Sequence, residues 1–306
     1  MDRDEWLALR RQNVGASEVA ALFGCQAAHQ QSHWTLWQVK AGRIPDPFVG
    51  NERVAWGLKL EQVIAEAARE RHGWYAVVRA QYVQHETVAG MGCTPDFYIL
   101  DGGKAVALLE TKNVDWLVRK RQWGDEPPMH ILLQLQHQLA CTGKPRGCIA
   151  ALVGGNELRT YEYERRPKLV AEIERRVTEF WRSIEEGREP PIDGSASTAD
   201  AVAALYPHDD GDDEPADMTG DNELPDLCAR LLRLSIERRD LQTAEQAARS
   251  AILAKLGDHR AARCMGFVLR AARSRDTPDR VIAPEMVGET IKGRAGSRRL
   301  TVREMT

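Results

Sequence analysis

Residues 91–113, MGCTPDFYILDGGKAVALLETKN, place three ionisable residues at the ends of two apolar stretches. Asp96 precedes the run FYIL, whereas Glu110 and Lys112 end the run AVALLETK. Apolar runs of this length are usually buried, and a buried charge is costly unless it is paired or bound to a metal ion. The pattern therefore indicates either a structural ion pair or a site that uses charge in chemistry.

The sequence DGGK between the two runs predicts a tight hairpin turn, because glycine accepts the positive φ that such turns need. Residues two apart in a strand face the same side, so Glu110 and Lys112 should project together while Thr111 faces away. The hairpin should also bring Asp96 beside Glu110. Two carboxylates and an ammonium group would then converge.

This group of residues would suit a hard divalent cation. Asp96, Glu110 and the backbone carbonyl of Thr111 are oxygen ligands of the kind that Mg²⁺ takes, with Mn²⁺ as an alternative. Lys112 would orient or help to deprotonate a water, or neutralise charge that builds on a phosphate. That is metal-assisted phosphodiester hydrolysis. The competing interpretation is a structural salt bridge between Glu110 and Lys112, because the pattern E-x-K also arises by chance.

The segments that must position these residues alternate between helical and strand periodicity, which predicts an α/β body. Helices are expected at residues 17–24, 32–42, 56–73, 129–144 and 167–187, with Ser17 as an N-cap. Strands are expected at residues 74–85, 88–100, 105–112, 147–155 and 157–165.

Charge divides the chain into three blocks. Residues 1–190 are balanced, residues 191–226 hold eleven acids and no Lys or Arg, and residues 227–306 carry a net charge of +8. We expect a globular domain at residues 1–192 and an extended acidic linker at 193–226, packed on the body through Leu205 and Tyr206. A basic helical extension should follow at 227–306.

The extension has leucines and alanines at helical spacing, which predicts one long helix or a pair of helices ending at Gly257. The segments ARCMGFVLRAA and SRRLTVRE resemble short strands. The positive charge would let this part contact DNA. An oligomerisation arm or a docking site for a partner protein is the alternative.

The six cysteines are scattered without a CxxC pair, which favours reduced thiols and argues against a zinc or iron–sulfur site. No run is apolar enough to cross a bilayer, and the start has no signal-peptide pattern. These observations predict a cytoplasmic protein; that the cell is a bacterium or a phage-infected host is implied only by the family resemblance described below.

The order TPD, hairpin, ETK resembles the PD-(D/E)XK nuclease signature. More specifically, the chain is similar to the lambda exonuclease and YqaJ viral recombinase group. The resemblance covers most of residues 1–193 and includes VGASEVAALFG, WGLKLEQVIAEAA, QLQHQLACTG, IAALVGG and FWRSIEEGREPPID. It implies a restriction-endonuclease-like fold, with a mixed central sheet flanked by helices.

The resemblance implies roles for individual residues. Asp96 and Glu110 match the metal-binding acids, and Lys112 matches the catalytic lysine. Glu61 matches a helix-borne acid that completes the metal shell or holds a second ion about 4 Å away. The alternative for Glu61 is a solvent-facing helical glutamate.

Three glutamines follow on the next helix. Gln134 and Gln136 match a Q-x-Q helix behind the site, where an amide can hydrogen-bond a water or the lysine. The alternative is a polar helix edge, and we favour that interpretation for Gln138.

Two further segments match DNA contacts. Arg10 and Ser17 match a loop that holds a terminal 5′-phosphate in lambda-type exonucleases, which suits an arginine fork and a helix N-terminus. Arg11 is an alternative to Arg10, and Ser17 could instead be a bare N-cap. In WLVRKRQWG, aromatic and basic residues alternate as in loops that grip phosphates and stack on bases. They are Trp116, Arg119, Lys120, Arg121 and Trp123. A solvated turn with inward tryptophans is the alternative.

The resemblance therefore implies a Mg²⁺-dependent deoxyribonuclease, foremost a 5′-to-3′ exonuclease acting on double-stranded DNA ends and leaving 3′ single-stranded tails for phage-type recombination. An endonuclease of the same fold and an inert DNA-binding scaffold are the alternatives. It also implies a homo-oligomer and a single-strand annealing protein as partner.

Overall fold

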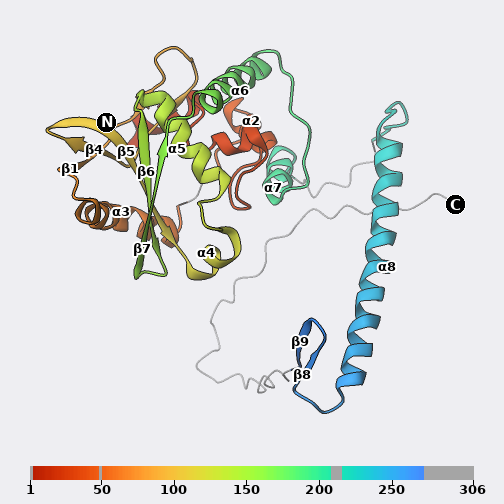
Figure 1. Cartoon of the computed structure of the whole chain (residues 1–306). Helices are drawn as coiled ribbons and strands as arrows, with labels where there is room; N and C mark the ends of the chain where they lie inside the picture. Colours follow the sequence, from red (N-terminus) through yellow and green to blue (C-terminus); the bar gives the residue numbers. More distant parts are fainter. Residues whose placement is uncertain (1–2, 48–49, 208–215, 272–306) are drawn as a thin grey trace, which may run out of the picture. The chain divides into compact units, whose positions relative to one another are not determined.

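The computed structural model describes residues 3–47, 50–207 and 216–271 (Figure 1). It divides the chain into two compact units, Met1–Pro207 and His208–Thr306, which are described separately below. The first unit is an α/β body and holds every motif quoted above except those of the C-terminal extension.

The body is built on a five-stranded mixed sheet with the order β1-β4-β5-β6-β7. Its strands are β1 Ala76–Arg79, β4 Phe97–Asp101, β5 Lys104–Val114, β6 Arg146–Val153 and β7 Glu157–Glu164. The central pair β5–β6 is parallel and the other three pairs are antiparallel. A separate two-stranded sheet pairs β2, Val83–Gln84, with β3, Gly92–Cys93.

The predicted hairpin joins β4 to β5. Asp101 pairs with Lys104, so only Gly102 and Gly103 form the loop. Their φ angles of 52° and 83° are both positive, as a type I′ turn requires. The pairing then shifts by one residue between Ile99 and Leu100, so that Phe97 lies opposite Leu109. The turn and this β-bulge together place Asp96 level with the end of β5.

Helices cover both faces of the sheet. They are α1 Arg3–Gln12, α2 His33–Lys40, α3 Glu52–His72, α4 Trp116–Gln122, α5 Met129–Thr142 and α6 Pro167–Glu185. Local signals agree with several boundaries: Ser32 and Asn51 cap α2 and α3 through their side chains, and Gly73 ends α3 with a φ of 65°. The predicted mixed sheet flanked by helices is confirmed.

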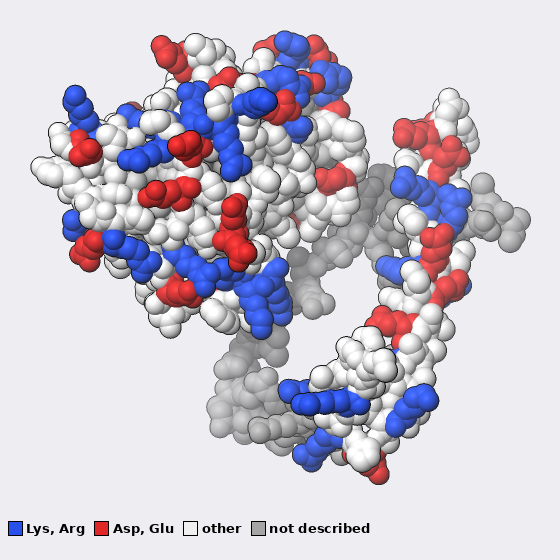
Figure 2. All heavy atoms as spheres, viewed as in Figure 1, with Lys and Arg blue, Asp and Glu red and all other residues white. Residues whose placement is uncertain are grey.

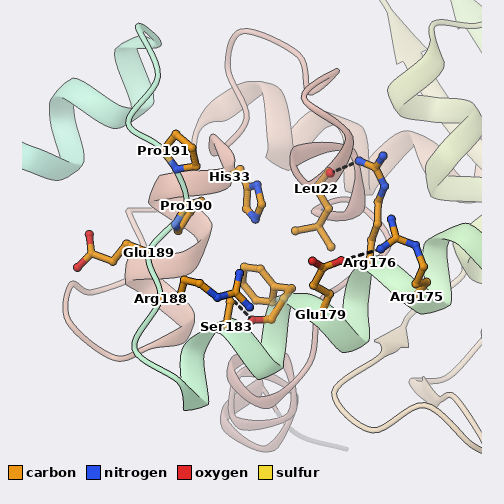
Figure 3. A pocket seen from close by; sticks show the side chains of 11 residues that line it. Leu22, His33, Arg175, Arg176, Glu179, Ser183, Arg188, Glu189, Pro190 and Pro191 are labelled. Carbon is orange, nitrogen blue, oxygen red and sulfur yellow. Dashed lines mark hydrogen bonds and ion pairs between the residues drawn. The ribbon is translucent and has the colours of Figure 1, made fainter.

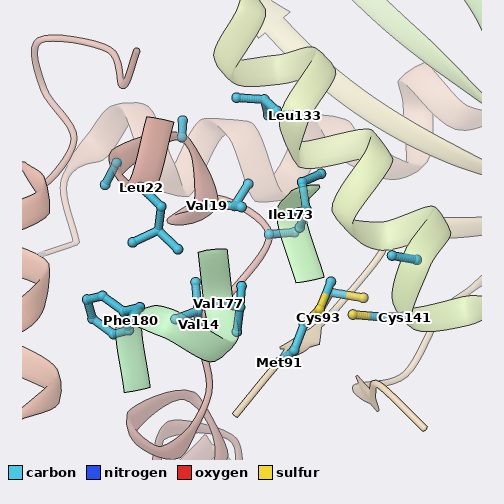
Figure 4. Packing of buried hydrophobic residues seen from close by; sticks show 14 of the residues in the cluster. Val14, Val19, Leu22, Met91, Cys93, Leu133, Cys141, Ile173, Val177 and Phe180 are labelled. Atoms are coloured by element: carbon cyan, nitrogen blue, oxygen red, sulfur yellow. The ribbon is translucent and has the colours of Figure 1, made fainter. Parts of the chain in front are cut away.

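Alternation along β5 separates two layers of the core. Leu109 packs with Ile64 and Ala68 of α3, whereas Leu108 packs with Leu135 and Leu139 of α5. Neighbouring strand residues face opposite sides, so α3 and α5 lie on opposite faces of the sheet. A third cluster packs α5 and α6 around residues 14–22 (Figure 4). All six cysteines are free thiols.

The segment that follows Ser17 differs from the prediction. It forms a five-residue 3₁₀-helix, Val19–Phe23, whose N-cap is Glu18 and which has no side-chain cap. Ser17 is therefore not an N-cap, and so short a helix offers no substantial dipole to an anion.

The start of the acidic segment also differs from the prediction. Ala196–Leu205 form helix α7, capped by the Ser195 side chain, rather than an extended linker. Leu205 packs in a cluster with Trp34 and Ile44, as expected, whereas Tyr206 is exposed. The stretch is rich in alanine, the strongest helix former, and its small apolar face packs against Trp34 and Ile44.

The second unit contains α8, Leu224–Leu256, and a hairpin of β8, Ala261–Cys264, and β9, Phe267–Arg270. The extension is thus one long helix followed by short strands, and SRRLTVRE lies outside the described residues. Within the described part of the chain, no helix is both long and apolar enough to span a membrane.

Candidate active site

Asp96 lies immediately before β4 and is held by one residue of β5. The backbone N–H and the hydroxyl of Thr111 both donate to Asp96 Oδ2, each at 2.8 Å. Thr111 was expected to face away from the site and to contribute only its carbonyl. Its hydroxyl instead fixes the rotamer of the carboxylate, because Asp96 sits at the strand edge rather than above the sheet.

Glu110 is buried and accepts hydrogen bonds at both carboxylate oxygens. Lys112 Nζ lies 2.6 Å from Oε1, which also accepts from Gln134 Nε2 at 2.5 Å. Gln138 Nε2 donates to Oε2 at 2.7 Å. Lys112 Nζ additionally donates to Gln134 Oε1 at 3.1 Å. We call Asp96, Glu110 and Lys112 the acid–lysine cluster.

Electrostatics within this cluster are strongly perturbed. Burial raises the pKa of Asp96 to about 7, and the nearby Glu110 carboxylate adds to the rise. Burial alone would lower the pKa of Lys112, but Glu110 and Asp96 together raise it above its ordinary value. Lys112 is therefore a cation at neutral pH, which favours charge neutralisation over base catalysis as its role.

Two crowded carboxylates are a donor set that a hard divalent cation would relieve. Asp96 and Glu110 fit such an ion, because Glu110 is a buried and Asp96 a half-buried oxygen donor, and the pair is only partly compensated by Lys112. No cluster of three or more His, Cys, Asp and Glu side chains close enough to hold a metal occurs in the described residues. The side chains thus supply two donors here.

Glu61 lies on α3 and lines the same cavity as the cluster, as predicted. Its Oε2 accepts a hydrogen bond from Arg79 Nη1 at 2.8 Å. It is near enough to raise the pKa of both Asp96 and Lys112. It is therefore not a free solvent-facing glutamate, although in this arrangement its charge is balanced by Arg79.

The structure corrects the assignment of the glutamines. Gln136 Nε2 donates to the carbonyl of Glu164, and Gln136 Oε1 accepts from Arg166 N–H, so this side chain ties α5 to the end of β7. Gln138 occupies the place beside Glu110 instead. Residues two apart in a helix point in nearly opposite directions, whereas Gln134 and Gln138 are four apart and share a face.

A cavity of about 870 Å³ joins the cluster to the first segment of the chain. Asp96, Glu110, Thr111, Lys112, Gln134, Glu61, Arg10 and Ser17 all line it. Helix α7 forms part of its wall through residues that include Asp200 and Ala204. The fold therefore gathers the predicted acids and the predicted phosphate-binding pair around one space.

Arg10 is not isolated at this cavity. Its Nη2 donates to Glu18 Oε1 at 2.9 Å, and its guanidinium lies 4.9 Å from the centre of the Trp6 ring. Glu18 Oε2 is 2.9 Å from Lys40 Nζ. We call Arg10, Glu18 and Lys40 the arginine cluster.

The predicted DNA-gripping loop is largely a helix, α4, and its two tryptophans differ. Trp123 is buried, with its ring 6.0 Å from that of Tyr161, so it cannot stack on a base. Trp116 is exposed. Arg119 donates to the carbonyl of Trp123, and the basic residues Arg119, Lys120 and Arg121 form the last turn of α4. Figure 2 shows basic side chains gathered over this part of the body.

A second cavity, of about 360 Å³, lies beside α6 (Figure 3). Two of its arginines are already engaged: Arg175 pairs with Glu179, and Arg176 donates to the carbonyl of Leu22. None of the acid–lysine cluster lines this space, so the larger cavity remains the candidate active site.

Sequence reasoning missed Gln138, Glu18, Lys40 and the wall formed by α7. The i, i+4 spacing from Gln134 was a usable signal for Gln138. Nothing in the local pattern joins Glu18 to Lys40, because their contact depends on how α2 packs against the start of the 3₁₀-helix Val19–Phe23.

Comparisons with known proteins agree with the motifs. Residues 5–145 match the family model of the YqaJ-like viral recombinase domain. The chain is 28% identical over 210 residues to the uncharacterized protein YqaJ of Bacillus subtilis (strain 168). That match covers 67% of this chain and 64% of the relative, so it spans less than two thirds of the relative's length.

Two solved structures are also similar. An alkaline exonuclease, LHK-Exo, from Laribacter hongkongensis is 24% identical with a TM-score of 0.49, covering 60% of this chain and 94% of that one. A phage related exonuclease from Haemophilus somnus 129PT is 13% identical with a TM-score of 0.42, covering 57% and 94%. The family match over residues 5–145 confirms the resemblance of this chain to the YqaJ-like viral recombinase domain.

Proposed function

We propose that the protein is a divalent-metal-dependent DNA nuclease that degrades duplex DNA from its 5′ ends and leaves 3′ single-stranded tails for recombination. One observation carries the proposal: the acid–lysine cluster and the Arg10–Ser17 pair line the same cavity. A hydrolytic centre and a site for a terminal phosphate are thus within one space. The match to the YqaJ-like viral recombinase domain supports it.

Asp96 and Glu110 are the residues that would hold Mg²⁺ or Mn²⁺, with the Thr111 carbonyl and Glu61 as further donors. When bound, the cation acts as a Lewis acid on the phosphodiester group. Thr111 orients Asp96, and Gln134 and Gln138 orient Glu110. Lys112, held cationic by these acids, neutralises charge that develops on the phosphate.

At the other end of the cavity, Arg10 offers a planar guanidinium to phosphate oxygens, and the exposed Ser17 adds a hydroxyl. A terminal phosphate carries more charge than an internal one, so a cationic site favours ends over the middle of a duplex. This pair therefore supports an exonuclease rather than an endonuclease.

The decisive experiment compares linear and circular duplex DNA, with Mg²⁺ and with EDTA. We expect Mg²⁺-dependent loss of linear DNA only, and faster loss when the 5′ ends carry phosphate. Labelling either the 5′ or the 3′ end reports the polarity directly.

Other results would replace the proposal. Nicking of circles in Mg²⁺ would indicate an endonuclease, and failure to cut either substrate would indicate a DNA-binding scaffold. Homo-oligomer formation, a single-strand annealing partner and a cytoplasmic location stay predictions from the resemblance and composition.

A further inference from the structure

The arginine cluster contains two buried charges that bind no substrate in the scheme above. The side chain of Lys40 is 3% exposed and that of Glu18 is 10% exposed, whereas that of Arg10 is 26% exposed. Only Arg10 and the outer part of Glu18 thus reach the cavity. Burying an ion pair is costly, so the arrangement calls for a role beyond stability.

Lys40 anchors the cluster to the backbone. Its ammonium group donates to the carbonyls of Arg10 and Asn13, at 2.6 and 2.8 Å, and lies 2.9 Å from Glu18 Oε2. An ammonium group has three N–H donors, and these three acceptors use all of them. Lys40 therefore ties the end of α1 to the carboxylate of Glu18.

Glu18 is fixed from a second direction. Its Oε2 also accepts a hydrogen bond from Gly15 N–H at 2.7 Å, which leaves Oε1 to accept from Arg10 Nη2. Burial would raise the pKa of Glu18, but Lys40 and Arg10 together hold the pKa below its ordinary value. The carboxylate is thus a charged, immobile acceptor for one edge of the guanidinium.

We propose that Glu18, anchored by Lys40 and Gly15, is a positioning residue that aims the free edge of the Arg10 guanidinium at the terminal phosphate of DNA. The assignment rests on the proposed function, because it assumes that DNA ends enter this cavity. Lys40 has a second effect: two cations against one carboxylate leave a net charge of +1. Without Lys40, the Arg10–Glu18 pair would be neutral and a poor anion site.

The test is the ratio of kcat/KM for duplexes with a 5′-phosphate to that for matched duplexes with a 5′-hydroxyl. Glu18→Gln should lower this ratio roughly 10- to 100-fold, the range expected for loss of a charge-assisted hydrogen bond. Hydrolysis of the 5′-hydroxyl duplex should change little. A lower ratio cannot be explained by charge alone, because Glu18→Gln removes a negative charge and would on that ground raise the preference for phosphate.

Three further variants keep the test decisive. Glu18→Asp keeps a buried carboxylate that balances the charge of Lys40, but its side chain is too short to reach Gly15 N–H and Arg10 at the same time. This variant should fold normally and still lose the preference for a 5′-phosphate. Arg10→Ala combined with Glu18→Gln should behave like Arg10→Ala alone, because one residue acts through the other. Glu172→Gln, which removes the partner of Arg175 and Arg176 on the surface of α6, is the matched control and should leave the ratio unchanged.

Binding of the same two duplexes in EDTA supplies a readout that does not need cleavage, and the affinity ratio should fall in parallel. An unchanged or higher ratio in both Glu18 variants, with the wild type discriminating, would overturn the positioning role. Equal losses on both duplexes would show a structural role instead. A wild type that ignores the 5′-phosphate would overturn the end recognition of the proposed function itself.

Discussion

The two charged clusters of the cavity both combine carboxylates with cations, but the ratio of acids to cations is reversed between them. The acid–lysine cluster sets two carboxylates against one ammonium, whereas the arginine cluster sets two cations against one carboxylate. With every group ionised, the first carries −1 and the second +1. Each lysine contacts the carboxylate of its own cluster at under 3 Å.

The difference indicates what each end of the cavity lacks. The first cluster is short of positive charge: burial raises the pKa of Asp96, the Glu110 carboxylate adds to the rise, and Lys112 offsets only part of it. The second has a cation to spare, and the lowered pKa of Glu18 reflects that excess. A divalent cation would balance the charge of the acid–lysine cluster, and a phosphate group would balance that of the arginine cluster. Charge balance therefore supports the proposed chemistry independently of motif matching.

The largest effect should follow from removing charge at the acid–lysine cluster. Asp96→Ala and Lys112→Ala should each lower cleavage of linear DNA by at least ~100-fold, because charge stabilisation at the reacting phosphate is lost. Circular-dichroism spectra should remain those of the wild type. Near-normal cleavage by either variant would show that the residue has been assigned wrongly.

At the arginine cluster, Arg10→Ala should act on binding. The affinity for 5′-phosphorylated ends should fall roughly 10- to 100-fold, and the slope of log affinity against log salt should shrink by about 1, as for loss of one phosphate contact. Titrations of labelled duplex at several salt concentrations in EDTA measure both. Arg11→Ala is the control, since Arg11 does not line the cavity; an equal effect there would reverse the choice between the two arginines.

The sequence was sufficient for the parts of this comparison that depend on local periodicity. The DGGK turn indicated that β4 and β5 form a hairpin, so Asp96, Glu110 and Lys112 could be brought together in advance, whereas the one-residue shift between Ile99 and Leu100 that sets their final register was not predicted. The helix and strand order followed from apolar spacing in the same way. These features depend on residues within about one hairpin or one helix of each other.

The remaining features depend on packing between distant segments. The Glu18–Lys40 contact joins the N-cap of the 3₁₀-helix Val19–Phe23 to the last residue of α2, and Trp123 is buried near Tyr161 of β7. Helix α7 was missed because the acidity of residues 191–226 as a whole was interpreted as a sign of an extended linker, although Ala196–Leu205 contains five alanines and only one acid. Gln136 was assigned from the resemblance to a Q-x-Q helix, whereas helical periodicity alone would have favoured Gln138, which shares a face with Gln134.

The glutamines allow a smaller and more specific test. Gln138→Leu removes a donor to Glu110 and should lower kcat roughly tenfold, within the range for a hydrogen bond to a charged group. Gln136→Leu should leave kcat unchanged, yet lower the free energy of unfolding by about 1–3 kcal/mol, because the Glu164 carbonyl and Arg166 N–H lose their partner. Urea melts and steady-state rates distinguish the two variants. A loss of kcat in Gln136→Leu and not in Gln138→Leu would restore the Q-x-Q interpretation.

The last effect is one of stability and pH at the acid–lysine cluster, and it needs no substrate. In metal-free protein, the pKa of Asp96 is raised from 3.8 to about 7, so folding disfavours its ionised form. The stability that this shift contributes is fully present below about pH 4 and is lost as the pH rises through 7. Asp96→Asn keeps an oxygen that can accept from Thr111, but its side chain cannot ionise. As the pH rises through that window, the free energy of unfolding of the variant should therefore increase relative to that of the wild type, by up to about 1.4 kcal/mol per pH unit.

Thermal melting in EDTA between pH 5 and pH 8, with the two proteins compared at each pH, isolates this residue because the other titrations cancel. Added Mg²⁺ should then stabilise the wild type at pH 8 and leave Asp96→Asn little changed, which reverses their order. Parallel curves in EDTA would mean that folding does not raise the pKa of Asp96, either through burial or through Glu110. The acid–lysine cluster would then have no charge shortage for a cation to relieve, and its contrast with the arginine cluster would fail.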